Sequence, residues 1–413
     1  MTKRVVVTGM GTVNSIGLDV ATTWNNAIHG VSGIGPITYF DSSDLNVHIA
    51  CEIKDFDPSQ TISTRLARRT DLFEQYALAA THEALQQSGL EVDEGNAERV
   101  AVVISTAVGG LISLEDAFDI LAHSGARRLS PFVIPKFMPN GASGMVAIET
   151  GAKGPCYSLA SACASGADSI GHAWLLLKAG IADAVIAGGS EATVCKIGIG
   201  TFDRVGALSR RNDPPFFTPS PFDANRDGLV MGEGSGIIVL ETLEHVEQRG
   251  ADVLAELIGY AATTDAYHIT APSVEGEGGA AAIRGAMASA GLNPEEIDYI
   301  NAHGTGTLLN DTAETHAIKK ALGEHAHRVP ISSTKSVTGH MMGATGALEG
   351  IFCVQAIREN IIPPTIHLHD PDPECDLDYV PLEAREHNVH VAVSNAFGFG
   401  GHNAVLAFRE FSG

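Results

Sequence analysis

GEGSGIIVLE at residues 232–241 and GFGGHNAVLAF at residues 398–408 share one pattern, a glycine-rich bend that leads directly into a hydrophobic strand. Around these two stretches, the same order of predicted strands and helices occurs twice along the 413 residues. Runs of β-branched residues bounded by glycine or polar residues alternate with helical patterns. The repetition predicts a weak internal duplication, with one half at residues 1–250 and the other at residues 251–413.

The hydrophobic periodicity predicts the elements of each half. In the first half we expect strands at residues 5–8, 100–105, 184–187 and 236–240, and helices at residues 73–87 and 165–178. In the second half we expect strands at residues 254–260, 297–301, 329–333, 389–393 and 405–408, and helices at residues 280–290, 312–322 and 344–357. Short, fully apolar strands are typical of sheets covered on both faces, so the chain predicts a layered α/β fold with sheets between helices.

The composition limits the function. Lys plus Arg number 26 against 49 Asp plus Glu, and the net charge of −23 argues against nucleic acid or an anionic membrane surface as a partner. No run approaches the roughly 18 apolar residues of a membrane-spanning helix, and the start of the chain predicts a first strand and no signal peptide. Six cysteines without a CxxC pair indicate a reducing compartment. We therefore expect a cytoplasmic protein.

Glycines at the start of the chain resemble a phosphate-binding turn only superficially. Gly9, Gly11 and Gly17 lack the GxGxxG spacing of a dinucleotide site, so we interpret them as a structural tight turn. The pairs His325/His327 and His367/His369 have no neighbouring cysteine or acidic spacing that predicts a zinc site. The sequence therefore predicts neither a nucleotide cofactor nor a metal.

Cys163 is the residue whose surroundings best suit a nucleophile. It lies in LASACASGADSIGHAWLLL, where small residues flank the sulfur and an amphipathic helix begins immediately afterwards. The partial positive charge and free N–H groups of a helix N-terminus favour a thiolate and bind an oxyanion. The alternative is a buried cysteine that acts only as a small hydrophobic residue, which is our interpretation of the other five.

Two histidines lie in loops that predict a site. His303 follows a predicted strand in INAHGTGTLLND, and His340 lies before an apolar helix in SSTKSVTGHMMGATGALEG. Glycine and threonine around each ring present it on a loop and not in a core. Most of the 17 histidines are expected to be ordinary surface or core residues.

Several motifs, in the same order, resemble the elongating β-ketoacyl-[acyl-carrier-protein] synthases, in particular the synthase II group. The resemblance covers nearly the whole chain. The motifs are RVVVTGMG (4–11), SACASG (161–166), DAYHITAP (265–272), NAHGTGT (301–307), TKSVTGHMMGATGALE (334–349) and NAFGFGGHN (395–403). The resemblance implies the thiolase-like fold, five αβαβα layers built from two similar halves, and a homodimer.

The resemblance also implies the reaction. An acyl chain would be carried as a thioester on Cys163 and condensed with malonyl-acyl carrier protein, giving 3-oxoacyl-acyl carrier protein, carbon dioxide and free carrier protein. His303 and His340 would hold the malonyl thioester carbonyl while carbon dioxide leaves. Backbone N–H groups of Cys163 and Phe399 would form the oxyanion hole. No metal or organic cofactor is implied, because decarboxylation generates the carbanion without a strong base.

Further residues are assigned by the same resemblance. Lys335 would polarise the histidine pair, unless it is an ordinary surface lysine. The other implied residues are Asp311 and Glu314, which would neutralise Lys335; Glu349, which would orient the His340 loop; Phe399 as a gate; Thr305, Thr307 and Thr270 on the pantetheine arm; and Val108 and Phe202 in the acyl pocket. For the threonines, turn capping is the alternative. Valine at 108 has less bulk than isoleucine, which favours an acyl pocket that tolerates longer chains.

Basic residues form islands in this acidic chain. Arg65, Arg68 and Arg69 share a helix face by their spacing, and Arg127 and Arg128 add charge from another segment. They resemble the surface that docks an acidic acyl carrier protein, the expected partner, whereas ion pairing with Asp71 or Glu74 is the alternative.

The chain also departs from the family at two positions. Gly206 stands where the family often carries an arginine at the entrance, so it cannot take that role. Ser161 stands where threonine is common, which has little consequence for the mechanism.

Other functions share some of these residues. A ketosynthase of a polyketide pathway would keep Cys163, His303 and His340 and differ in its pocket and partner surfaces. A non-catalytic partner subunit that only shapes a chain-length tunnel is disfavoured by the presence of Cys163. A thiolase needs a second reactive cysteine, and neither Cys353 nor Cys375 lies in a glycine-rich loop. A papain-like hydrolase would release free acid, so product identity separates it from a condensing enzyme.

Overall fold

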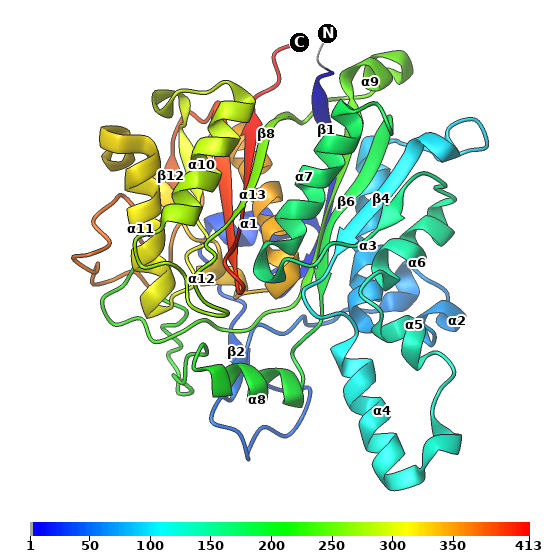
Figure 1. Ribbon diagram of the computed structural model, residues 1–413. Coiled ribbons are helices and arrows are strands. Elements are labelled where there is room, and N and C mark those ends of the chain that lie inside the picture. Colours follow the sequence, from blue (N-terminus) through cyan, green and yellow to red (C-terminus); the bar gives the residue numbers. More distant parts are fainter. Residues whose placement is uncertain (1–2) are drawn as a thin grey trace.

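One mixed sheet of 10 strands organises the protein, whose computed structural model describes residues 3–413 (Figure 1). The strand order is β10-β9-β13-β14-β8-β1-β7-β6-β4-β5. The strands are β1 Val5–Asn14, β4 Val100–Ser105, β5 Cys156–Tyr157, β6 Ala184–Glu191, β7 Gly234–Thr242, β8 Ala255–Thr264, β9 Tyr299–Asn301, β10 Ile331–Ser332, β13 Val391–Gly398 and β14 His402–Arg409. Two-residue strands pair outside this sheet, β2 Gly35–Pro36 with β3 Ile49–Ala50 and β11 Ile361–Ile362 with β12 Arg385–Glu386.

The sheet consists of two runs with the same plan. β5-β4-β6-β7-β1 comes from the chain before residue 243, and β10-β9-β13-β14-β8 comes from the chain after residue 254. The two opening stretches occupy equivalent places, since β7 lies between β6 and β1 as β14 lies between β13 and β8. A short antiparallel pairing, Val6 with Glu256 and Val7 with Ala255, joins the runs into one sheet. The glycine-rich bend and strand that occur twice in the sequence therefore occupy equivalent positions in the two runs.

Helices cover and separate the two runs in five layers (Figure 1). α3 (Leu72–Ser88) packs on β1, β6 and β7 at the outside. α7 (Ser165–Lys178) and α13 (Thr345–Glu359) lie between the runs, and each contacts strands of both. α10 (Glu277–Ala290) packs on β8 and β14, and α11 (Leu308–Leu322) packs on α10. The predicted layered α/β fold is confirmed.

The remaining helices are shorter or more exposed, and the hydrophobic pattern did not predict them. They are α1 Val20–Ile28, α2 Thr64–Ala67, α4 Leu111–Ser124, α5 Val133–Phe137, α6 Gly141–Thr150, α8 Lys196–Val205, α9 Leu243–Arg249 and α12 Lys335–Thr338. Among them α4 projects from the body at the bottom of the view (Figure 1).

The opening glycines do not form the tight turn expected of them. β1 continues past Thr8 to Asn14, and the turn comes later, where Asn14 and Gly17 exchange backbone hydrogen bonds of 2.8 and 3.2 Å. A Cβ atom on Gly9 would lie 2.1 Å from the Ala84 carbonyl oxygen of α3, and one on Gly11 would lie 1.9 Å from that of Ala80. These glycines therefore let the helix approach the strand closely. Met1 and Thr2, which precede the predicted first strand, lie outside the described residues.

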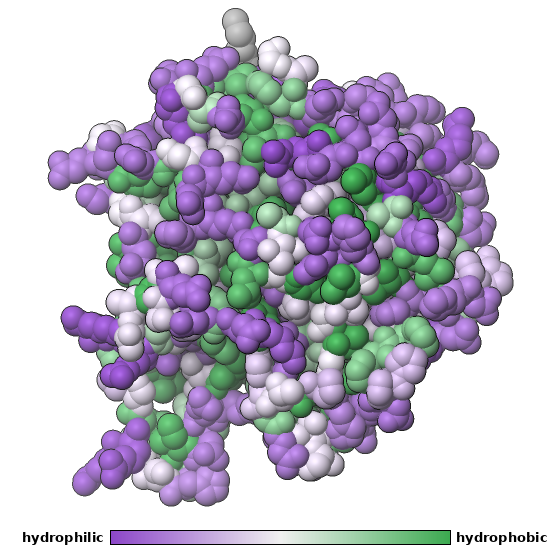
Figure 2. Space-filling view, turned by 180° about the vertical axis from the view of Figure 1, so that it is seen from behind, coloured by the Kyte–Doolittle hydropathy of each residue, from purple (hydrophilic) through white to green (hydrophobic). Residues whose placement is uncertain are grey.

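Seen from behind, the surface is largely hydrophilic, with hydrophobic side chains in patches between the polar ones (Figure 2). Within residues 3–413, every helix is too short or too polar to reach across a bilayer.

Candidate active site

A cavity of about 350 Å³ collects eight of the predicted site residues, among them Cys163 and both histidines. Its walls come from both halves of the chain. The predicted residues that line it are Cys163, Phe202, Thr270, His303, Thr305, Thr307, His340 and Phe399. The fold thus gathers residues that are up to 236 positions apart, Cys163 and Phe399 being the extremes.

Cys163 lies at the start of the central helix, as its sequence predicted. It is in the short 3₁₀ turn Ala162–Ala164, which continues into α7. Burial raises the pKa of the Cys163 thiol to about 11, against the opposing effects of Lys335 and of the backbone N–H groups of Phe399 and Cys163. The expectation that this thiol has a lowered pKa is wrong, because desolvation outweighs the positive groups around it. Near neutral pH the Cys163 side chain is therefore a neutral thiol.

Backbone N–H groups converge on the sulfur. Those of Cys163 and Phe399 are the two that lower the thiol pKa, so both face the sulfur. Gly398, the last residue of β13, lets this strand approach the backbone around Cys163 closely. An added Cβ there would lie 3.0 Å from the Cys163 nitrogen and 2.8 Å from the Ser161 oxygen. This is the donor pair that an oxyanion hole requires.

Gly398→Ala is expected to reduce acylation of Cys163 by about 10²-fold, the effect of losing one oxyanion-hole donor. The added methyl group must push the Phe399 amide away from the sulfur. Acyl transfer from an acyl thioester measures the effect, with Gly144→Ala as the control, because a Cβ there meets nothing within 4 Å. Acylation within about threefold of the unaltered protein would contradict this geometry.

The tautomer of His340 follows from its neighbours. Its Nδ1 accepts a hydrogen bond from the backbone N–H of Met342 at 3.2 Å, and the Thr345 hydroxyl lies 3.0 Å from the same atom. Since an amide N–H can only donate, Nδ1 carries no proton and Nε2 carries it. Burial, and then Lys335, lower the pKa of His340 well below its usual value. His340 is therefore a neutral Nε2–H donor.

His303 lies edge-on to His340, with ring centroids 5.4 Å apart and an angle of 84° between the ring planes. Burial lowers its pKa well below the usual value, and the charges of Lys335 and His340 act in the same direction. Its backbone N–H donates to Glu314, whereas its buried Nδ1 has no hydrogen-bond partner among residues 3–413. Both rings are thus neutral and adjacent in the cavity.

Lys335 is not a surface residue. Its side chain is 1% exposed, and its Nζ lies 2.5 Å from Oε1 of Glu349, which is 2% exposed. Glu349, on α13, pairs with Lys335, which lies five residues before His340 in the same segment, and its role in orienting the His340 loop stays a prediction. Burial raises the pKa of Glu349 to about 8, with Lys335 opposing the rise. The pair fixes a positive charge beside Cys163 and both histidines.

The other two predicted acidic residues, Glu314 and Asp311, accept hydrogen bonds from backbone N–H groups. Glu314 accepts the N–H groups of His303 and Gly304 at 2.8 and 2.7 Å, so it fixes the loop that carries His303. Lys335 acts on Glu314 only through space, as an opposing effect on a pKa that burial raises. The prediction that Asp311 neutralises Lys335 is wrong, because Asp311 faces Arg226 at 3.7 Å.

The walls of the cavity carry the predicted aromatic and hydroxyl side chains. The Phe399 and Phe202 rings stack at 6.3 Å with an interplanar angle of 20°. The hydroxyls of Thr305 and Thr307 lie 2.9 Å apart. Val108 is not among the residues that line this cavity, and the turn before it is bonded to Glu191, which accepts from the Thr106 hydroxyl and the Ala107 N–H. Its place in the acyl pocket stays a prediction.

The predicted docking arginines lie at the surface. Arg65 is on α2, which ends at Ala67, so Arg68 and Arg69 follow the helix and do not share one face of it. Asp71 and Glu74, the alternative partners, instead form the capping box of α3. All three arginines are exposed, as are Arg127 and Arg128 on the 3₁₀ turn after α4.

Some cavity residues were missed by the sequence analysis. Leu308 and Leu309 line the cavity and are 62% and 57% exposed, and Asp227 and Leu229 line it from the other half. The apolar pair in TGTLLND, next to the loop of His303, was the available signal for the first two. The pairs His325/His327 and His367/His369, which the sequence does not predict to form a metal site, lie outside this cavity, with His325 bonded to the Ile297 carbonyl and His367 to that of Pro219.

Known proteins resemble this chain throughout its length. Two family models match, the beta-ketoacyl synthase N-terminal domain at residues 2–246 and the C-terminal domain at residues 254–369. The chain is 49% identical to 3-oxoacyl-[acyl-carrier-protein] synthase 2 of Synechocystis sp. (99% of this chain, 98% of that protein), and 48% identical to the protein of that name from Staphylococcus aureus strain COL (99% of each).

A solved structure has the same fold. It is described as AntDE:AntF, a type II PKS acyl-carrier protein in complex with its ketosynthase bound to the hexaketide. It aligns over 100% of both chains with a TM-score of 0.92 and 34% sequence identity. The layered architecture, the cavity with its cysteine and two histidines, and the full-length matches agree, and the chain belongs to the beta-ketoacyl synthase family.

Proposed function

We propose that this protein is a 3-oxoacyl-[acyl-carrier-protein] synthase that elongates fatty acyl chains by two carbons. The observation that carries the proposal is a buried cysteine at a helix start that shares one cavity with two neutral histidines and a buried lysine. The relatives at 48–49% identity have this name, which supports the fatty-acid assignment.

The first step is transfer of the acyl chain. The Cys163 sulfur attacks the thioester carbonyl of acyl carrier protein, the new carbon–sulfur bond forms, and the carrier thiolate leaves. The proton of the Cys163 thiol ends on the departing carrier thiol, so the step needs no external acid or base. The N–H groups of Cys163 and Phe399 stabilise the oxyanion that forms on the carbonyl oxygen.

The second step is decarboxylative condensation. His340 and His303 bind the malonyl thioester oxygen, the bond to the carboxylate breaks, and carbon dioxide leaves with the electron pair retained as an enolate. The enolate carbon attacks the Cys163 thioester, which forms the 3-oxoacyl product and releases Cys163 as a thiolate that takes a proton from water. Neutral rings suit this role, because they stabilise the enolate oxygen without protonating the carbon.

The substrate arm and chain have separate places in this proposal. The thioester arm lies along Thr305, Thr307 and Thr270, whose hydroxyls suit its amide groups. The acyl chain passes the stacked rings of Phe399 and Phe202. Gly400, with φ +84°, allows the Phe399 loop to change conformation when the chain enters.

An acyl carrier protein is the proposed partner. Arg65, Arg68 and Arg69 are exposed and, within the described residues, form no salt bridge, so their charge is available to an acidic protein. Arg127 and Arg128 add charge beside the projecting α4 (Figure 1). The solved ketosynthase structure that contains its carrier protein supports this class of partner.

Replacing Arg65, Arg68 and Arg69 with alanine is expected to raise KM for acyl carrier protein substrates about tenfold at low salt. The difference should shrink as salt screens the charges, and turnover of the free acyl-pantetheine thioester should not change. The matched control removes three exposed arginines of the second half, Arg284, Arg328 and Arg358. Equal effects of the two triple variants would contradict the docking site.

Three structural expectations remain proposals. We propose a homodimer that pairs through β5, because this strand ends the sheet and nearby helices expose Phe118, Ile134 and Ile148 at 61, 65 and 71%. We also propose a cytoplasmic location, and a division into halves at residue 250.

The proposed function is tested by supplying acyl and malonyl carrier protein and identifying the product. A 3-oxoacyl thioester two carbons longer, with one carbon dioxide per product, is the expected result. Free fatty acid as the only product would contradict it and indicate a hydrolase. Repeated condensation to a polyketone without reduction would indicate the polyketide ketosynthase, which the AntDE:AntF similarity keeps as the second candidate.

A further inference from the structure

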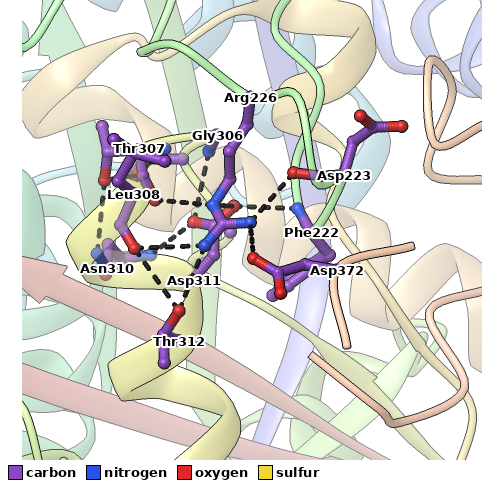
Figure 3. Close-up of polar contacts among 12 residues, drawn as sticks. Phe222, Asp223, Arg226, Gly306, Thr307, Leu308, Asn310, Asp311, Thr312 and Asp372 are labelled. Atoms are coloured by element: carbon purple, nitrogen blue, oxygen red, sulfur yellow. Dashed lines mark hydrogen bonds and ion pairs between the residues drawn. The ribbon is translucent and has the colours of Figure 1, made fainter. Parts of the chain in front are cut away.

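One buried arginine holds the loop that carries Thr305 and Thr307 from behind. Arg226 precedes β7, does not line the cavity, and has a side chain that is 2% exposed. Figure 3 shows its guanidinium between the start of α11 and the loops that contain Asp223 and Asp372.

Every N–H of this guanidinium has a partner. Nε donates to the Thr307 carbonyl at 3.1 Å, and Nη2 donates to the Leu308 carbonyl and the Thr312 hydroxyl, both at 3.1 Å. Nη1 donates to the Asp223 carbonyl at 2.9 Å and to the Asp372 carboxylate at 2.6 Å. An arginine has five N–H donors in a fixed fork, so this side chain fixes three segments of the chain relative to one another.

Asp311 completes the arrangement. Its carboxylate accepts the backbone N–H of Phe222 at 2.9 Å and that of Gly306 at 3.2 Å, and it lies 3.7 Å from Arg226. The Gly228 N–H also donates to the Gly306 carbonyl at 3.0 Å. Two walls of the cavity, residues 227–229 and residues 305–310, are therefore bonded together behind the surface that they present.

The electrostatics favour a positioning role over a stabilising one. A guanidinium at the N-terminus of α11 faces the positive end of the helix dipole, which is unfavourable. Asp311 and Asp372 offset this charge, but a buried ion pair adds little net stability after desolvation. The five hydrogen bonds fix the relative positions of the segments that they join. Three of them end on Thr307, Leu308 and Thr312, at the start of α11.

We propose that Arg226 is a positioning residue for the thioester arm of the substrate. It holds the Thr305–Thr307 loop in the conformation that presents both hydroxyls to the cavity. This inference rests on the proposed function, because it assumes that these hydroxyls bind the arm. It predicts that loss of the fork weakens arm binding while the nucleophile stays intact.

Arg226→Lys separates geometry from charge, since lysine keeps the positive charge but has three donors and no fork. We expect KM for an acyl-pantetheine thioester to rise about tenfold with kcat within about threefold. The rate of Cys163 alkylation by iodoacetamide, which has no arm, should stay within twofold. Amide hydrogen exchange in residues 303–312 should be faster than in the unaltered protein. Arg249→Lys is the control, because Arg249 pairs with buried Glu241 and neither residue lines the cavity.

A KM within twofold of the unaltered value, or alkylation that falls in parallel with acylation, would overturn the proposal. If Arg226→Lys does not fold, the double variant Arg226→Met/Asp311→Asn removes both buried charges and takes the same measurements. If the unaltered protein is alkylated but not acylated, the proposed function fails. Hydrogen exchange is then the one remaining test of whether Arg226 positions the loop. Unchanged exchange in residues 303–312 would overturn the positioning role, and faster exchange would support it.

Discussion

Replacing Cys163 with alanine is expected to reduce formation of the 3-oxoacyl product by about 10⁴-fold or more, because among the described residues that line the cavity Cys163 is the one thiol for the proposed acyl thioester. The measurement is product formation from acyl and malonyl carrier protein. Release of carbon dioxide from malonyl carrier protein should persist in the variant, since His303 and His340 are unchanged. Loss of carbon dioxide release together with condensation would show that the variant is misfolded or that the roles are wrongly assigned.

The same cysteine predicts a pH dependence. Its thiol pKa of about 11 means that the thiolate fraction rises about tenfold per pH unit between pH 7 and pH 10. The rate of iodoacetamide alkylation should rise in proportion and should not level off below pH 10. A plateau near pH 7 would show that the positive groups around the sulfur outweigh its desolvation. Cys163→Ala gives the background rate from the other cysteines.

Replacing Lys335 with methionine is expected to reduce condensation by about 10²-fold or more and to lower the free energy of unfolding by about 3 to 5 kcal/mol. The stability loss arises because Glu349 is left buried without its cation. The activity loss arises because the charge that favours the Cys163 thiolate, and that adds to burial in lowering the pKa of both histidines, is gone. Without that charge the thiol pKa rises further, so alkylation at pH 8 should be slower.

A double variant separates the two effects. Lys335→Met/Glu349→Leu replaces the buried pair with apolar side chains, which restores most of the stability but not the activity. Arg249→Met, which breaks the pair with buried Glu241 outside the cavity, should lower stability without the loss of condensation rate. Recovery of condensation in the double variant would show that Lys335 is only structural.

The strands of the sheet were largely predictable from the sequence, because a strand is identified by a short run of neighbouring residues. β4 and β7 each contain a continuous apolar run, VAVVI and IIVL, are fully buried and are bounded by polar residues or glycine, so their pattern alone identifies them. β1 was cut short because its glycines were interpreted as a turn, whereas they contact α3, a helix more than 60 residues away. α4 was missed although its apolar residues Leu111, Leu114, Phe118 and Leu121 recur at helical spacing, and the structure leaves Phe118 and Leu121 exposed.

The site was predictable where its chemistry is concentrated in short motifs. The segments around Cys163, His303 and His340 were found from their small and glycine-rich surroundings and from the family resemblance, and the fold brings them into one cavity. The partners of charged groups were not predictable. Lys335 and Glu349 are 14 residues apart and meet only because α13 packs beside the loop. Arg226 gave no signal, because its acceptors come from three separate segments.

The most direct test of the central claim is the mass of the intact protein, first with a long-chain acyl carrier thioester and then with malonyl carrier protein. The predicted result is an acyl adduct on Cys163 that disappears on the second addition as a 3-oxoacyl carrier thioester two carbons longer is formed. Cys163→Ala should give neither. An adduct on another residue, or a product formed by Cys163→Ala at the unaltered rate, would contradict the account.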